Sequence, residues 1–274
     1  MNPAYLVPRV IRHFLPERIV RFILLRSLII KPGLETIDPQ GAVLRYLDVL
    51  KLKRISLQGK RVFVFGYGGR LDIGVGLLDA GARYVVLCDL YARPDQRHNE
   101  TLQRGHPEYI VEDGDAWRPS PNHLELIEGD IRVLAPPEAG QRFDLVISTS
   151  VYEHVDDARG VTKALARWTK AEGIHIHFVD LRDHYFRYPF EMLKFSERIW
   201  RSFLNPTSNH NRLRMWDYRQ MFDACFADVE VEVLARDEAA FALARAAMQP
   251  EFISGVAAED PATLIRIIAR RPRL

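Results

Sequence analysis

The segment from residue 62 to residue 89 constrains the fold of this chain more than any other part. It reads as a buried apolar strand, a turn with Gly66, Gly68 and Gly69, a helix, and a second apolar strand that ends on Asp89. Glycines let the backbone turn sharply and approach a ligand closely, and the following helix presents unpaired N–H groups at its start. An acidic residue about 20 positions onward is placed to accept hydrogen bonds from ribose hydroxyls. The pattern therefore predicts a site for a nucleoside-containing cofactor.

The residues around this turn disfavour a nicotinamide dinucleotide. A dinucleotide fingerprint requires a third glycine at position 71, where this chain has Leu71. A short-chain reductase would also carry a Tyr-x-x-x-Lys pair, and none of the ten tyrosines is followed by lysine four residues later. These residues therefore disfavour hydride transfer as the reaction of this protein.

Beyond residue 60, short apolar runs alternate with helical stretches, which is typical of βαβ units. The predicted strands are 61–65, 84–88, 123–127, 143–148, 174–179, 229–234 and 263–270. Their spacing leaves room for the crossover connections that parallel strands need. We therefore expect an α/β fold, with a Rossmann-like, doubly wound, mostly parallel seven-stranded sheet and an N-terminal helical extension.

Three helices are predicted in the second half of the chain. The first begins at Asp156 or Asp157 and ends at Gly173, the second runs from Pro189 to Leu204, and the third begins near Asp217. The chain contains no internal repeat or linker to a second domain. We expect a helical N-terminal arm over residues 1–55 and one catalytic domain over 56–274.

Two further motifs follow the later strands. The third strand ends in Glu128-Gly129-Asp130-Ile131, and the fourth lies in FDLVISTSVYEHV, residues 143–155. Together with the glycine turn, these motifs resemble the class I S-adenosylmethionine-dependent methyltransferases from about residue 60 to the C-terminus. The resemblance implies that S-adenosyl-L-methionine is the cofactor. The residues that it assigns to cofactor binding are Phe65, Gly66, Tyr67, Gly68, Asp89, Leu90, Asp130, Ile131, Ser148 and Thr149.

Within this resemblance, Asp89 corresponds to the ribose-binding acid and Asp130 to the acid that contacts the adenine amino group. The chain departs from the family at two positions, since Val64 replaces an acid and Arg70 replaces the third loop glycine. Tyr67, Arg70 and Asp72 are the candidates to replace the missing contacts. The segments at 175–186, 194–200 and 211–222 resemble an uncharacterised bacterial branch of the superfamily.

Polar residues that follow the fourth and fifth strands are candidates for chemistry and acceptor binding. Ligands of open α/β sheets bind outside the carboxyl ends of the strands. The predicted catalytic residues are His154, Asp183 and His184, and the predicted substrate-binding residues are Arg182, Tyr185, Asn211 and Arg212. A histidine can act as general base because its pKa lies near physiological pH. Each of these residues also has an ordinary structural interpretation, as a loop contact or an ion-pair partner.

The function that follows is methyl transfer to an oxygen or nitrogen of a small-molecule or glycan-type acceptor, with no metal. One alternative is a metal-dependent hydrolase that uses His175, His177 and Asp180, although no second ligand cluster completes that set and packing under a helix is favoured for the two histidines. Another alternative is an inactive binding protein of the same fold, which Val64 and Arg70 motivate.

The net charge of +2 conceals a basic N-terminus. Residues 1–31 contain six Lys or Arg side chains against Glu17, so the rest of the chain is mildly acidic and nucleic acid is not an expected partner. Residues 17–31 have helical length but too many charges to span a membrane or act as a signal peptide. We expect residues 9–31 to contact a second subunit or the surface of a membrane. Two widely spaced cysteines favour a cytoplasmic location, which includes the inner membrane face.

Overall fold

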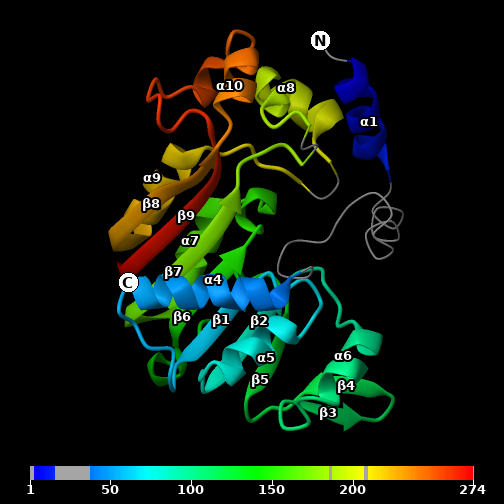
Figure 1. The fold of residues 1–274 in the computed structure, drawn as a ribbon, viewed down its shortest axis with the longest axis vertical. Coiled ribbons are helices and arrows are strands. Elements are labelled where there is room, and N and C mark those ends of the chain that lie inside the picture. The colour runs from blue at the N-terminus through cyan, green and yellow to red at the C-terminus, as the bar shows by residue number, and fades with distance from the viewer. Residues whose placement is uncertain (1–2, 16–37, 185–186, 207–208, 274) are drawn as a thin grey trace.

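A computed structural model describes residues 3–15, 38–184, 187–206 and 209–273 (Figure 1). Its helices are α1 (Pro3–Phe14), α4 (Pro39–Leu52), α5 (Asp72–Asp79), α6 (Gln96–Gln103), α7 (Ala158–Trp168), α8 (Glu197–Ile199), α9 (Met215–Cys225) and α10 (Glu238–Arg245). Its strands are β1 (Arg61–Phe65), β2 (Tyr84–Asp89), β3 (Ile110–Asp113), β4 (Ala116–Pro119), β5 (Leu124–Glu128), β6 (Phe143–Thr149), β7 (Thr169–Asp180), β8 (Phe226–Arg236) and β9 (Ala262–Pro272).

Seven of these strands form one twisted sheet in the order β5-β2-β1-β6-β7-β9-β8. The first five are parallel, and β9 is antiparallel to both of its neighbours. Each strand of the sheet contains one of the seven apolar runs, so the prediction of a mostly parallel seven-stranded sheet is confirmed. The order reverses between β1 and β6, which creates a crevice at the carboxyl ends of these two strands.

Helices cover both faces of the sheet, because alternate side chains of a strand point to opposite faces. Val62 and Val64 belong to a core with α4 and α5, whereas Phe63 belongs to a core with α7 and α9. The central strands are buried on both sides, as expected of parallel strands between helical layers. This arrangement confirms the doubly wound fold. The domain boundary at residue 55 remains a prediction, although α4 contributes Tyr46 and Leu50 to the first core.

A third apolar cluster joins the N-terminal helix to the segment after β7. Tyr5 of α1 packs with Phe190, Leu193 and Trp200, and α10 adds Ala244. Figure 1 shows α1, α8 and α10 together at one end of the molecule, with the β3–β4 hairpin at the other. The described part of the N-terminal arm is therefore packed against the body of the protein.

The predicted helix from Pro189 to Leu204 is interrupted, so that prediction is wrong. The chain forms a 3-10 turn at Glu191–Lys194, an extended residue at Phe195, then α8 and a π-helical turn at Trp200–Leu204. Arg212 donates hydrogen bonds to the carbonyls of Met192 and Phe195. A guanidinium thus binds carbonyls that a continuous helix would need for its own hydrogen bonds.

Two other local predictions fail for simple reasons. The predicted helix start at Asp157 is confirmed, but the helix ends at Trp168 and Gly173 lies inside β7 without a left-handed conformation. The β3–β4 hairpin was missed. Its turn contains Gly114 with φ of 61° next to Asp113, and an Asp-Gly pair between apolar residues is a hairpin signal that the sequence offers.

Candidate active site

The glycine turn after β1 has the backbone that its sequence predicts. Gly66, Gly68 and Gly69 all have positive φ, at 82°, 70° and 94°. A Cβ on Gly66 would lie 2.3 Å from a methyl group of Val151, so only glycine lets the loop after β6 approach this closely. A Cβ on Gly69 would lie 2.7 Å from the carbonyl oxygen of Arg93. The loops after β1, β2 and β6 therefore meet in one place, at the carboxyl edge of the sheet.

Asp89, at the end of β2, organises two of these loops. Its carboxylate accepts hydrogen bonds from the backbone N–H of Tyr91 and Ala92 at 2.8 Å, and from Gly68 at 3.3 Å. The side chain is only partly buried, and the neighbouring Leu90 is exposed. A partly exposed acid and an apolar side chain beside a glycine loop suit the ribose and base of a nucleoside.

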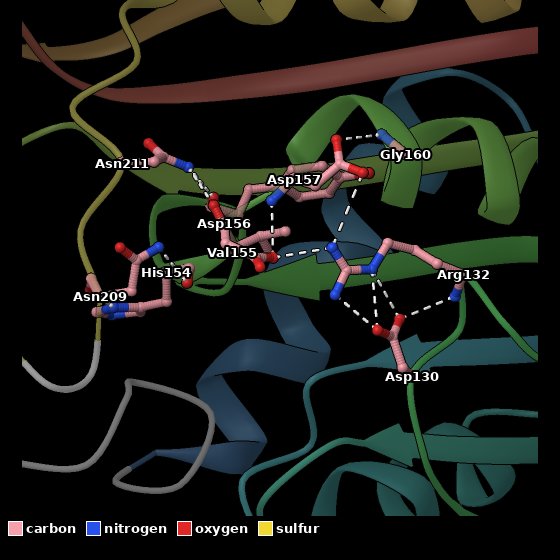
Figure 2. A network of polar contacts seen from close by, with 10 residues as sticks. Asp130, Arg132, His154, Val155, Asp156, Asp157, Gly160, Asn209 and Asn211 are labelled. Atoms are coloured by element: carbon pink, nitrogen blue, oxygen red, sulfur yellow. Dashed lines mark hydrogen bonds and ion pairs between the residues drawn. The ribbon is translucent and has the colours of Figure 1, made fainter.

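Asp130, after β5, is bound by an arginine that the sequence analysis missed. Arg132 contacts both carboxylate oxygens of Asp130 at 2.6–3.0 Å and reaches Asp156 at 3.0 Å (Figure 2). These hydrogen bonds hold the pKa of Asp130 below its ordinary value. A contact from Asp130 to an adenine amino group therefore requires Arg132 to release one of its hydrogen bonds. Ile131, beside it, is buried.

The residues near the cofactor's predicted amino-acid end differ in whether they have internal partners. The Tyr67 side chain is buried, and its hydroxyl has no hydrogen-bond partner within the described ranges. The carboxylate of Asp72 is bonded to Nε2 of His98 at 2.7–2.8 Å. Thr149 is bonded through its hydroxyl to Tyr46 at 2.7 Å. Phe65 is partly exposed at the end of β1.

A chain of hydrogen bonds runs inward from Ser148 and fixes both histidines of β7. Thr169 donates to the carbonyl of Leu165, so its hydroxyl oxygen accepts from Nε2 of His175 at 2.7 Å. Nδ1 of His175 then accepts from Nε2 of His177 at 3.1 Å, and Nδ1 of His177 accepts from Ser148 at 2.8 Å. Every ring nitrogen of His175 and His177 therefore takes part in a hydrogen bond.

This chain of hydrogen bonds removes the support for a metal-dependent hydrolase. Burial lowers the pKa of His177 to about 3 and that of His175 well below its ordinary value, so both rings are neutral. Neither ring has a lone pair left for a metal ion. Asp180, the third predicted ligand, is bound by Arg182 at 2.6–3.2 Å. The alternative that these histidines pack under a helix is correct, since His177 contacts Phe222 of α9.

A second polar cluster lies where β6 and β7 end. The rings of His154, His184 and His210 pack edge to face, with centroids 4.7–5.9 Å apart. Nδ1 of His154 donates to the carbonyl of Asn209 at 2.8 Å, and the Asn209 amide donates to the carbonyl of His154 at 3.0 Å (Figure 2). The structure thus brings the predicted catalytic residues His154 and His184 together, and adds His210.

Burial makes His184 a poor general base. Desolvation lowers the pKa of His184 to about 2, and the positive charges of neighbouring residues, of which His154 has the largest effect, lower it in the same direction. An efficient general base has a pKa near the working pH. This finding corrects the expectation that His184 removes a proton from the acceptor.

Glu153 is the buried residue of this cluster that the sequence analysis did not single out. Its side chain is 1% exposed, and burial raises the pKa of its carboxyl well above the ordinary value. The backbone amides of Glu153 and Asp180 face the carboxyl, but no described residue hydrogen-bonds to either oxygen with ordinary geometry. A signal was present in the sequence, because Glu153 directly precedes His154 at the end of a predicted strand.

Asp183 was predicted to be catalytic, but its carboxylate anchors the N-terminal helix. It is fully buried, accepts a hydrogen bond from Tyr5 and forms an ion pair with Arg9. Because Arg9 is only 2% exposed, its charge cannot contribute to a basic surface that contacts a membrane. The remaining predicted contact residues 16–31 lie outside the described residues, as does Tyr185.

Asn211 and Arg212 hold the polypeptide rather than present free groups. The Asn211 amide donates to the carbonyls of Tyr152 and Val155, and its oxygen accepts from Leu213. Arg212 is 1% exposed and pairs with Glu197 in addition to its two carbonyl contacts. Both assignments to substrate binding are therefore corrected to structural roles in the wall of the site.

A cavity of about 730 Å³ lies beside the histidine cluster. Its wall includes Asn205, Asn209, His210, Trp200 and Phe252, a mixture of amide, imidazole and aromatic groups. Cavities of this size hold small molecules. Three non-glycine residues with positive φ surround the area, namely Ser150, Asn209 and Arg212. Such strain is often found at functional sites.

Comparison with known proteins supports the predicted fold and family. Residues 71–177 match the family model for the methyltransferase domain. This stretch runs from the helix after the glycine turn to the strand that carries His177. This match supports the prediction that the chain is a class I S-adenosylmethionine-dependent methyltransferase. The match also supports the prediction that S-adenosyl-L-methionine is the cofactor.

Solved structures of methyltransferases are similar to this chain at low sequence identity. A Galdieria sulphuraria protein described as a sarcosine dimethylglycine methyltransferase is 12% identical, with a TM-score of 0.50, over 85% of this chain and 86% of its own. Magnesium protoporphyrin IX methyltransferase from Synechocystis is 14% identical, with a TM-score of 0.46, over 85% and 80%. A methyltransferase from Mesorhizobium loti is 16% identical, with a TM-score of 0.42, over 82% and 96%. No curated protein matches.

Proposed function

We propose that this methyltransferase transfers a methyl group from S-adenosylmethionine to an oxygen or nitrogen of a small-molecule or glycan-type acceptor. The observation that carries the proposal is the convergence of the glycine loop, Asp89 and the loop after β6 at one edge of the sheet. The edge fits the cofactor, since the loop has no Cβ atoms at Gly66, Gly68 and Gly69 and the Asp89 carboxylate is partly exposed.

Within the proposal, the backbone of Gly66 and Gly68 approaches the amino-acid part of the cofactor and Asp89 binds its ribose. Leu90 and Ile131 flank the base, and Asp130 lies at its edge. Bound there, the cofactor would supply the methyl group of its sulfonium to the acceptor oxygen or nitrogen, with the carbon–sulfur bond broken and S-adenosylhomocysteine as the leaving group. The protein then contributes mainly by orienting the acceptor.

The acceptor side of the proposal rests on the cavity beside His210. Its volume of about 730 Å³ suits a small molecule or a terminal sugar. Asn205 and Asn209 offer amide groups to hydroxyls, and Trp200 offers an aromatic surface. Because His184 and Asp183 are excluded as bases, we expect the acceptor's proton to pass to water.

Isothermal titration with S-adenosylhomocysteine tests the cofactor site. The wild-type chain is expected to bind, and Asp89→Asn is expected to weaken binding at least tenfold because one charge-assisted hydrogen bond contributes roughly 1.5–3 kcal/mol. Asp223→Asn, at an exposed position on α9, is the matched control and should bind like wild type. Folded wild-type protein that binds no cofactor at millimolar concentration would contradict the proposal.

The N-terminal arm carries a separate proposal, contact with a membrane surface or a second subunit through residues 9–31. Among the residues that the structure describes, no helix is long and apolar enough to cross a membrane. The α1 face formed by Val7, Ile11 and Phe14 is exposed and supports such a contact. Liposome flotation and light scattering of Ile11→Glu against wild type test the two partners. Unchanged results in both assays would contradict the proposal.

A further inference from the structure

The cluster of Glu153, His154 and His184 has the composition of a metal site. One potential ligand atom from each residue lies within 4.8 Å of the others. Two ligands about 2.1 Å from a metal ion can be at most about 4.2 Å apart, so small side-chain rotations bring the three atoms to coordinating distance. Two imidazoles and one carboxylate form a ligand set typical of zinc and non-haem iron sites.

Glu153 supplies the second, independent indication of a cation. Its carboxyl is 1% exposed, and neither oxygen accepts a hydrogen bond of ordinary geometry from a described residue, although the backbone amides of Glu153 and Asp180 face it. The nearest basic nitrogen recorded is Nε2 of His184, 3.9 Å from Oε1. A buried carboxylate without a partner is costly, whereas a bound cation would satisfy both oxygens. Nδ1 of His210, next to His184, is also buried without a partner in the described part of the chain.

The hydrogen bonding of His154 orients it as a ligand. Because Nδ1 donates to the carbonyl of Asn209, the lone pair of the neutral ring resides on Nε2. Histidines that bind metals usually donate their other N–H to a carboxylate or a backbone carbonyl in this way. The reciprocal contact from the Asn209 amide to the carbonyl of His154 holds the same loop in place (Figure 2).

The charge of Arg182 acts on the carboxyl of Glu153, and the charges of Arg9 and Arg12 act on His184. Arg182 is bound to Asp180, and Arg9 is paired with Asp183. Because arginines bind the carboxylates of Asp180 and Asp183, neither carboxylate is available as a metal ligand. The ligand set is thus limited to Glu153 and the histidines beside it.

We propose that Glu153, His154 and His184 bind one divalent transition-metal ion at the carboxyl ends of β6 and β7. Three protein ligands leave coordination positions open, and His210, which packs against His184, lines the neighbouring cavity. If the proposed methyl transfer holds, an oxygen of the acceptor can occupy an open position and lose its proton to water more easily. The metal site itself does not depend on that reaction.

Metal binding to the full chain tests this inference directly. After treatment with EDTA and dialysis, the protein is titrated with Zn²⁺ and Mn²⁺ without cofactor, and bound metal is measured by mass spectrometry. We expect one equivalent of at least one of the two metals. Glu153→Gln should weaken that binding by more than about 100-fold, because even residues that only orient ligands change metal affinity 10–100-fold.

His106→Ala is the matched control. His106 belongs to a surface group with Asp79 and Glu108 that also contains three potential ligands, but these residues are largely exposed. The variant should bind metal like wild type. Wild-type protein without stoichiometric metal would overturn the inference, and so would metal binding that His106→Ala abolishes while Glu153→Gln retains it.

Co²⁺ provides a readout that does not depend on the stability of one variant. Nitrogen and oxygen ligands give bound Co²⁺ visible absorption bands, which we expect in wild type and expect to be lost in His184→Asn. Equal spectra for the two proteins would overturn the inference. Cofactor titration is a separate experiment, so failure of the metal site and failure of the proposed function are distinguishable.

Discussion

The two ends of the parallel strands differ in how the carboxyl groups of Asp144 and Glu153 are satisfied. At the amino ends, Asp144 of β6 accepts hydrogen bonds from the Arg61 N–H and from Lys170, both at 2.9 Å, and lies 3.5 Å from Lys60. At the carboxyl ends, the Tyr67 hydroxyl and both oxygens of Glu153 are buried and have no partner among the described residues.

This difference indicates which end of the strands contributes to stability and which end contributes to function. Buried polar groups are normally paired, and exceptions gather at functional sites. A small cavity of about 90 Å³ lies at the amino ends, lined by Leu50, Leu57 and Asp144 among others, but the carboxylate of Asp144 is already paired. We therefore assign function to the carboxyl ends, where the loops also meet.

The largest expected effect concerns the buried ion pair at the carboxyl end. Arg9→Met leaves Asp183 buried with an uncompensated charge, which should lower the free energy of unfolding by about 3–5 kcal/mol. Urea denaturation measures this loss. The double variant Arg9→Met/Asp183→Asn should recover much of it, because no buried charge remains. A loss below about 1 kcal/mol in the single variant would show that α1 is not anchored by this pair.

A smaller effect of opposite sign is expected at Glu153. Glu153→Met replaces an unpartnered carboxyl with an apolar side chain of similar length, so the metal-free protein should gain about 1–3 kcal/mol of stability. Thermal denaturation in EDTA measures this gain. A loss of stability would mean that Glu153 is satisfied in the folded protein, and the contrast between the two ends would be broken.

The smallest effect is expected at the amino end. Asp144→Asn should cost about 1 kcal/mol at pH 7, because a partly exposed carboxylate loses its charge-assisted hydrogen bonds. Urea denaturation of both proteins across pH measures this cost. Asp223→Asn, which alters no recorded contact, should change stability by less than about 0.5 kcal/mol.

The pH dependence of the Asp144 effect has a defined sign. Burial alone would raise the pKa of Asp144, but hydrogen bonds from Arg61 and Lys170 and the nearby Lys60 outweigh it and lower the pKa. A carboxyl with a lowered pKa in the folded state stabilises above its unfolded pKa and loses that stabilisation as the pH falls through the folded value. The difference between wild type and Asp144→Asn should therefore shrink below about pH 4. A difference that grows in acid would contradict this assignment.

The sequence predicted the sheet because its signals are local. All seven strands are short apolar runs, and the glycine turn requires positive φ wherever it occurs. The helix start at Asp157 was equally local, since the side chain caps the N–H of Gly160 three residues later.

The polar residues of the site were harder to predict because their partners are distant in sequence. Asp183 is bound by Tyr5, 178 residues away, and Asn211 is bound to the carbonyl of Tyr152, 59 residues away. Placement at the end of a strand gives the right neighbourhood for such residues but not their partners. Arg132 and Glu153 were missed for the same reason, since their roles follow from contacts and burial that only the folded chain reveals.

A crystal structure with S-adenosylhomocysteine tests the central claim most directly. We predict ligand density along Gly66 and Gly68, with the ribose on Asp89 and the sulfur toward the side of the site that holds His154. Density in the amino-end cavity near Leu57, or none at saturating ligand, would contradict the assignment of function to the carboxyl ends of the strands.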